Sequence, residues 1–283
     1  MSRTNWLAAG ALCAAVPAAA ADVDGTELIK AAPVLCAILF VGILVLLETG
    51  RRFATSRLRS DPEGARAGVG TVEGAVFGLL ALLIAFTFSG AAERFNARRA
   101  LIVEETNDIG TAWLRLDLLP PEEQPALREL FRRYTDSRIE TYRKLPDVEA
   151  HEAESARSAR LQAQIWEHAI RAIRNADSAP TTTLLLPALN AMFDIASTRA
   201  MAGRTHPPLI IFIMLVAVVL AGATFVGYGM AGGRSRSWLH VLGFAIVMTL
   251  TVYVIIDLEY PRVGLIRVDA ADQMMTVLRE TMR

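Results

Sequence analysis

The sequence lacks an excess of charge of either sign. Its 29 basic and 29 acidic residues cancel, so no net positive charge indicates nucleic-acid binding. Cysteine is also scarce. Cys13 falls in a predicted leader and Cys36 in a long apolar run, so we expect no disulfide.

Signals for catalysis are missing too. The four histidines show no H-E-x-x-H spacing, and no serine or cysteine occupies a nucleophile elbow. They are His151, His168, His206 and His240. We therefore expect no metal, no cofactor and no enzyme activity.

Long uncharged runs are abundant. Four runs contain no Asp, Glu, Lys or Arg, and they cover residues 31–47, 74–92, 205–233 and 237–256. A helix of about 20 residues crosses the hydrocarbon core of a bilayer, and about 17 to 25 are tolerated. Four such runs in two pairs rarely share one soluble core. The sequence therefore predicts an all-α membrane protein, with transmembrane hairpins at 31–92 and 206–257. The lack of charge within the spans argues against a proton-coupled transporter.

The N-terminus resembles a leader. Arg3 precedes an apolar stretch and the small residues 18–21, a pattern typical of a signal peptide at 1–21 cleaved before Asp22. The alternative is a short uncleaved anchor helix. Positively charged residues in short loops stay on the cytoplasmic side of a membrane. We therefore expect the Arg-rich loops at 48–71 and around Arg234 and Arg236 in the cytoplasm. Both alternatives then place the protein in a bacterial inner membrane, with residues 93–205 and the tail 258–283 in the periplasm.

Residues 93–205 predict a helical bundle outside the membrane. The segment is charge-balanced, and a helix runs on from the second span to Leu119 without a breaker. Its apolar residues share one face: Phe95, Ile102, Ile109, Trp113 and Leu116. We expect further helices after Pro120-Pro121, from about Val148 to Asn175, and after Pro180. Pro187 should bend the last of these helices or mark its true start.

A dense polar face follows the second span. Glu104 and Asp108 lie one turn apart and repel, so Arg115, Arg199, a bound cation or water must offset them. One interpretation is a solvated stripe with local ion pairs. The other is a set of charged rings that selects ions at the vestibule of a symmetric oligomer. The candidates are Glu93, Arg94, Glu104, Asp108, Thr111, Arg115 and Arg199.

Two further patterns lie in the second span. Gly70, Gly74 and Gly78 form a small-residue face that packs within the chain or against another subunit. A large apolar face forms a hydrophobic constriction, or it faces lipid and neighbouring helices. Its members are Phe77, Leu80, Ile84 and Phe88.

The tail begins where the last span ends. Asp257 and Arg262 pair with each other or with charged faces of the bundle. Together with Asp269 they are the expected contacts of the tail.

Several stretches resemble a bacterial membrane family called bestrophin-like. The specific one is residues 78–120, GLLALLIAFTFSGAAERFNARRALIVEETNDIGTAWLRLDLLP. Shorter ones are ETGRR at 48–52, LNAMFDIASTR ending at Arg199, and DLEYPRVGLIRVD at 257–269. The resemblance implies two spans, a helical domain and two more spans, and kinship with bestrophins, which are pentameric anion channels. Bestrophins keep their large domain in the cytoplasm, opposite to the orientation that the charges favour here.

These observations predict a homo-oligomeric channel or pore for small ions. The alternative is a membrane-anchored helical scaffold or signalling protein whose bundle binds a periplasmic partner. A channel must form a closed ring, whereas a scaffold needs none.

Overall fold

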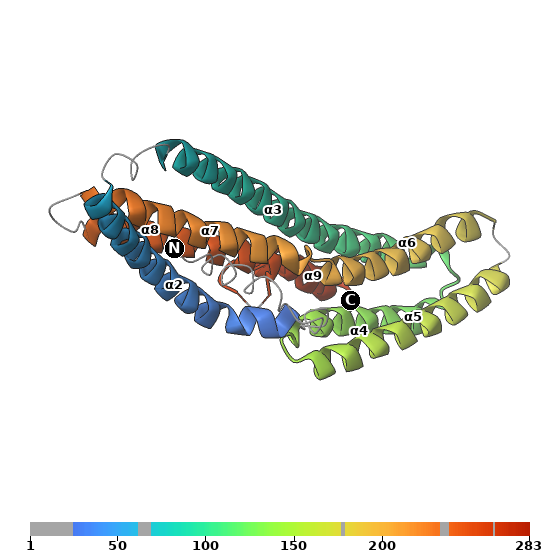
Figure 1. The fold of residues 1–283 in the computed structure, drawn as a ribbon. Helices are drawn as coiled ribbons and strands as arrows, with labels where there is room; N and C mark the ends of the chain where they lie inside the picture. Colours follow the sequence, from blue (N-terminus) through green and yellow to red (C-terminus); the bar gives the residue numbers. More distant parts are fainter. Residues whose placement is uncertain (1–24, 62–68, 177–178, 233–237, 263) are drawn as a thin grey trace. The chain divides into compact units, whose positions relative to one another are not determined.

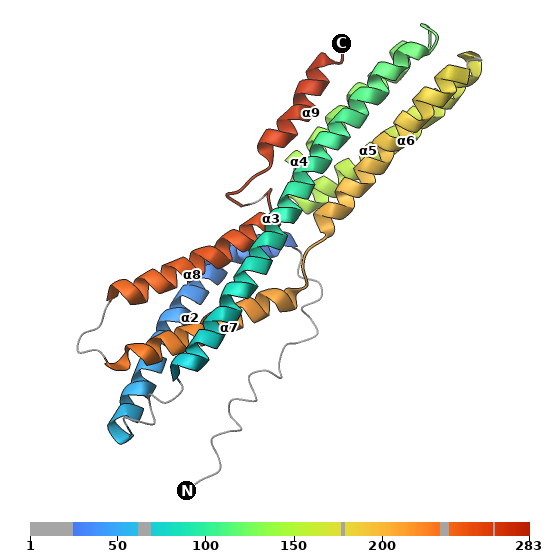
Figure 2. The ribbon, with the colours of Figure 1, turned by 90° about the horizontal axis from the view of Figure 1, so that it is seen from above.

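The structure is a computed structural model that describes residues 25–61, 69–176, 179–232, 238–262 and 264–283. Every regular element in these ranges is a helix (Figures 1 and 2). The predicted signal peptide and Arg66, Arg234 and Arg236 lie outside the described residues. The elements are α2 (Gly25–Ser60), α3 (Val69–Arg115), η2 (Leu116–Leu118), α4 (Gln124–Arg143), α5 (Val148–Ala176), α6 (Ala179–Arg204), α7 (Leu209–Gly229), η3 (Met230–Gly232), α8 (Trp238–Glu259) and α9 (Asp269–Thr281).

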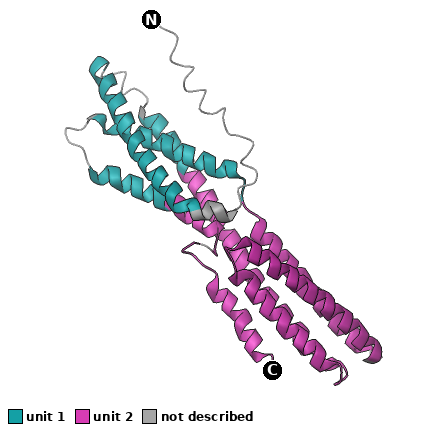
Figure 3. Cartoon of the chain, turned by 90° about the horizontal axis from the view of Figure 1, so that it is seen from below, with its two compact units in different colours: residues 1–80, 207–250 teal, residues 81–206, 251–283 magenta. Residues whose placement is uncertain are grey.

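The predicted helical class and the four long apolar helices are confirmed. The helices long and apolar enough to cross a membrane lie within residues 31–60, 70–118, 179–229 and 238–259. The chain divides into two compact units, coloured separately in Figure 3. Unit 1 comprises residues 1–80 and 207–250, and unit 2 comprises residues 81–206 and 251–283. The arrangement as two hairpins and an extramembrane bundle stays a prediction.

Unit 1 is held by a close crossing of α2 and α7. A Cβ atom at Gly227 would overlap the carbonyl oxygen of Leu47, and one at Gly50 would overlap the carbonyl oxygen of Thr224. Only glycine lets the two backbones approach this far. At Gly222, by contrast, a Cβ would make an ordinary van der Waals contact of 3.5 Å with the ring of Phe77 on α3.

Unit 2 is built around a core of large side chains. The core joins the second half of α3 to α4, α5, α6 and α9, and the ring centroids of Trp113 and Phe131 lie 6.3 Å apart within it. The largest fully buried members are Ile109, Leu116, Leu127, Phe131, Tyr134, Ile165, Leu185, Leu189 and Met192. The apolar periodicity of α3, α4, α5 and α6 therefore matches the face of each of these helices that is buried in the core.

Helix α3 confirms the prediction of an uninterrupted helix after the second apolar run. Its 47 residues correspond to a length of about 70 Å at 1.5 Å per residue, well beyond the ~30 Å of a bilayer core. Helix α6 settles the alternatives for Pro187. It begins at Ala179, so Pro187 lies inside the helix and does not mark its start.

The tail contains a helix that the sequence analysis missed. Helix α9 buries Ala271 and Met275 in unit 2, and Met282 follows it into the core. Its apolar positions are few and its length is 13 residues, so its periodicity is short. Burial against α4 decides its conformation, because isolated helices of this length are marginal in water.

Candidate functional site: a buried arginine network in unit 2

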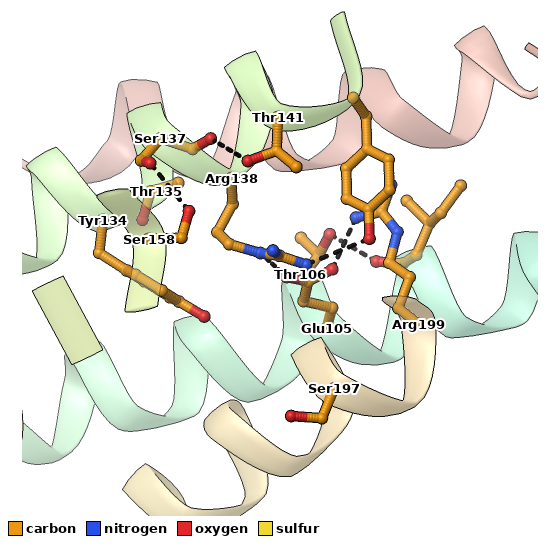
Figure 4. A network of polar contacts seen from close by, with 12 residues as sticks. Glu105, Thr106, Tyr134, Thr135, Ser137, Arg138, Thr141, Ser158, Ser197 and Arg199 are labelled. Atoms are coloured by element: carbon orange, nitrogen blue, oxygen red, sulfur yellow. Dashed lines mark hydrogen bonds and ion pairs between the residues drawn. The ribbon is translucent and has the colours of Figure 1, made fainter. Parts of the chain in front are cut away.

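Glu105 is a fully buried carboxylate in the middle of unit 2. It lies on α3, and two arginines from other helices bind its two oxygens (Figure 4). Arg138 of α4 donates from Nε to Oε1 at 2.5 Å, and Arg199 of α6 donates from Nη1 to Oε2 at 2.6 Å. One side chain thus joins three helices. A buried carboxylate requires such partners, because an unpaired charge in the interior is strongly unfavourable.

The network continues to the tail through Asp272 of α9. Arg199 donates from Nη2 to Asp272 Oδ1 at 2.9 Å. Arg262 donates from Nη1 to Oδ2 at 2.7 Å and from Nη2 to Oδ1 at 3.1 Å. This two-bond pairing fixes the orientation of the guanidinium relative to the carboxylate. Three arginines and two carboxylates therefore connect α3, α4, α6 and the tail.

The three arginines also share one aromatic ring. The Cζ atoms of Arg199, Arg262 and Arg138 lie 3.7, 4.5 and 5.3 Å from the ring centroid of Tyr142. Each guanidinium is attracted to the ring face, a contact worth about 0.5–1 kcal/mol at sites that water reaches. The ring thereby offsets part of the repulsion among three positive groups.

Arg138 stays charged in this setting. Burial alone would lower the pKa of its guanidinium, but the charge of Glu105 and the nearby Tyr142 and Tyr134 raise the pKa above its ordinary value. Three permanent positive charges thus meet two carboxylates. Among these five side chains one positive charge is therefore in excess.

Among the predicted vestibule residues, only Arg199 belongs to this network. Glu93, Glu104 and Thr111 are exposed, and Asp108 is half-buried. Arg115 donates from Nη1 to the carbonyl of Leu184 at 2.6 Å. The carboxylate that Arg199 binds is Glu105, the neighbour of the predicted Glu104.

Arg94 belongs to a second cluster in unit 2, centred on the buried Glu259. Arg94 donates from Nε to Glu259 Oε1 at 2.8 Å. Arg98 donates from Nη1 to the Glu259 carbonyl at 2.6 Å and from Nη2 to the Thr205 carbonyl at 2.9 Å. His206 Nδ1 lies 3.7 Å from Glu259 Oε2. This cluster links the segment after α6 to the end of α8.

The three residues predicted to form the contacts of the tail, Asp257, Arg262 and Asp269, all have partners, but they do not pair with one another. Asp257 is buried and accepts hydrogen bonds from the backbone amides of Leu265 at 2.9 Å and Ile266 at 2.7 Å. Arg262 pairs with Asp272 instead of Asp257, so the proposed pairing of these two residues is wrong. Asp269 pairs with Arg267 at 2.8 Å.

The apolar and glycine candidates of the second span lie on α3. Within the described residues, a Cβ at Gly70, Gly74 or Gly78 would meet no other helix and no side chain beyond its chain neighbours within 4 Å. The four large apolar candidates differ in how deeply they are buried. Leu80 is buried and the Phe77 ring packs edge-on at 6.4 Å against Phe244, whereas Ile84 is half-buried and Phe88 is exposed.

The sequence analysis missed Glu105, Arg138, Tyr142 and Asp272. A signal existed for the first of them. Glu105 follows Ile102 by three residues and precedes Ile109 by four, so it lies on the buried face of α3. A carboxylate in an apolar stripe indicates a buried partner of opposite charge.

Several solved structures have a similar fold. The chain matches crystal structures of a bacterial bestrophin homologue from Klebsiella pneumoniae. One, a tryptophan-to-alanine variant, has a TM-score of 0.66 and 13% identity, covering 86% of this chain and 95% of that one. Another, phased on zinc, has a TM-score of 0.62 and 17% identity, covering 86% and 97%. None of the curated proteins matches the chain.

The family assignment rests on the sequence itself. A family model described as the bestrophin-like domain matches residues 33–272, which is most of the chain and includes both buried clusters. The chain therefore belongs to the bestrophin-like family.

Proposed function

We propose that the protein is a homo-oligomeric ion channel in a lipid bilayer. Membership of the bestrophin-like family and the shared fold support this assignment. The observation that carries this proposal is the small share of α3 that is buried inside the chain. In its most apolar window only 11% of the residues are buried inside the chain, against 28% for α2 and for α8.

The exposed apolar surface of α3 is available for contact with another copy of the chain. Leu79, Leu82, Phe86 and Phe88 are all exposed large hydrophobic residues on this helix. The open glycines Gly70, Gly74 and Gly78 would allow a helix of another copy to approach closely. A ring of copies joined along α3 would place this helix beside the central axis.

The charged continuation of α3 fits a vestibule. Glu104, Asp108 and Thr111 lie on one face, and Glu105 on another is fully paired in the interior. Repeated around an axis, the first two would form acidic rings that attract cations. Glu104→Gln with Asp108→Asn should shift the reversal potential of reconstituted protein under asymmetric salt. An unchanged reversal potential would exclude the rings as a selectivity filter.

The channel assignment is tested by counting subunits and measuring flux. The purified chain in nanodiscs should give one closed oligomer by mass photometry, and in liposomes it should pass ions. Gly74→Leu should dissociate the oligomer and abolish flux. Gly203→Leu is the matched control, because the side chain also meets open space there. A monomer without flux would contradict the channel and favour the scaffold.

We also propose that residues 93–205 lie on the periplasmic side, as the Arg-rich loops favour. A reporter fused after Leu145 that is active only in the periplasm would support this orientation. Activity only in the cytosol would overturn the orientation and leave the channel proposal untouched.

A further inference from the structure

A cavity of about 250 Å³ opens beside the arginine network, entirely within unit 2. Side chains of α4, α6 and α9 line it, together with the segment that precedes α9. The residues that matter for its chemistry are Arg138, Tyr142, Arg143, Arg199, Arg262 and Arg267. Its volume suits a small ligand, since sites for drug-sized molecules begin at about 300 Å³.

The lining carries excess positive charge. Five arginines line the cavity, and the acidic residues among the lining are Asp269 and Asp272. Two carboxylates outside the lining each neutralise one further charge: Glu105 pairs with Arg138 and Arg199, and Glu140 pairs with Arg143. One positive charge therefore remains. Positive charge enclosed in a cavity concentrates anions, because the low-dielectric walls strengthen its field.

The arginines lie at different depths in the cavity. The side chains of Arg138 and Arg199 are 6% and 5% exposed and form the inner wall. The side chains of Arg143 and Arg267 are 64% and 52% exposed and form the rim. A ligand would meet the rim first and then the buried pair, whose positions are held by Glu105 and the Tyr142 ring.

The rim arginines have donors to spare. Arg143 uses Nη1 to bind Glu140 at 2.7 Å, and Arg267 uses Nε to bind Asp269 at 2.8 Å. In the part of the chain that the structure describes, neither guanidinium contacts a second acceptor. A guanidinium carries five N–H donors, so most of those on the two side chains remain for a ligand.

We propose that this cavity binds a phosphate group. Arginines from three separate segments reach the same small space, which suits a tetrahedral anion with oxygens on several sides. A single carboxylate is planar and is satisfied by one fork. The lining residues all belong to one chain, so phosphate binding is measured independently of channel activity.

The test measures binding of inorganic phosphate to the delipidated full chain in detergent, by calorimetry at constant ionic strength. Wild-type protein should show saturable binding. Arg143→Gln with Arg267→Gln should raise the Kd about tenfold or more, through loss of charge-assisted hydrogen bonds. The matched control is Arg160→Gln with Arg171→Gln, which removes the same charge from two exposed positions of α5 and should leave the Kd unchanged.

A second arm identifies the source of the phosphate. Nanodiscs of phosphatidylcholine with added phosphatidic acid present the group on a lipid, whereas inorganic phosphate presents it free. Binding that the Arg143→Gln, Arg267→Gln variant weakens supports the site, and the arm in which it occurs shows whether the phosphate is free or carried by a lipid. Absence of saturation in both arms overturns the proposal. So does an equal effect of the rim and control variants, or binding of succinate as tight as that of phosphate.

Discussion

Unit 1 and unit 2 are stabilised by different residues. In unit 1, glycines bring the backbones of α2 and α7 together, and large apolar side chains such as Ile38 and Val41 remain exposed. In unit 2, Phe131, Tyr134 and their neighbours form a buried core around a paired carboxylate. Helices in lipid gain little from burying apolar surface and depend on close van der Waals contact. Replacing a glycine should therefore lower the stability of unit 1. Removing a buried charge should lower the stability of unit 2.

The largest effect is expected at Glu105. Glu105→Ala leaves Arg138 and Arg199 buried beside an empty space, and it should destabilise unit 2 by about 3–5 kcal/mol. Glu104→Ala is the matched control, since the adjacent side chain is exposed and its loss should change stability by about 0.5 kcal/mol at most. Urea unfolding in detergent, followed by near-ultraviolet circular dichroism, measures both. Equal losses would mean that the buried network contributes nothing.

The second effect tests unit 1. Gly227→Ala places a methyl group on the Leu47 carbonyl, and separating the helices should cost about 3 kcal/mol. Gly70→Ala adds the same methyl group where the chain has open space, so the isolated chain should lose nothing. The melting temperatures of the two variants in detergent give the comparison. A stable Gly227→Ala protein would contradict the close crossing.

A smaller, pH-dependent effect is expected at Glu154. Burial alone would raise the pKa of this carboxyl, but hydrogen bonds from Lys144 and Ser137 and the charges of Lys144 and Arg157 hold the pKa below its ordinary value. Its contribution, about 1–2 kcal/mol, is present above the pKa of the unfolded chain, about 4.3, and is lost as the pH falls through the lower pKa of the folded state.

The measurement compares wild type with Glu154→Gln across pH. The difference in unfolding free energy should be full at pH 7 and vanish in acid. Glu152→Gln, an exposed substitution in the same helix, should give no difference at any pH. A constant gap between wild type and Glu154→Gln would exclude the ionised carboxyl as its cause.

The last two substitutions are at Tyr142, where the smallest effect is expected for Tyr142→Phe. Tyr142→Leu removes the ring that three guanidiniums share and should cost about 1–2 kcal/mol. Tyr142→Phe keeps the ring and loses only a hydrogen bond of 3.3 Å from Arg138, so it should cost about 0.5 kcal/mol. Thermal unfolding distinguishes them, and equal losses would assign the effect to the hydroxyl group.

The sequence anticipated the elements better than their partners. The apolar runs and the periodicity of Ile102, Ile109 and Trp113 predicted the helices and their buried faces, because both depend on residues near in sequence. The prolines marked most helix ends for the same reason. Helix α9 was missed, because its stability comes from packing against unit 2 and not from its own pattern.

Partner choice was beyond the sequence. Which arginine binds Glu105, and that Arg262 binds Asp272 instead of Asp257, depends on contacts between residues 10 to 94 positions apart. The glycine spacing marked Gly70, Gly74 and Gly78, whereas the close crossing occurs at Gly50 and Gly227. Hydropathy and periodicity are properties of a segment, so the sequence alone determined the apolar helices, the buried stripes and the family. Only the tertiary structure decided which charges meet and where a cavity remains, because both follow from how separate helices pack against one another.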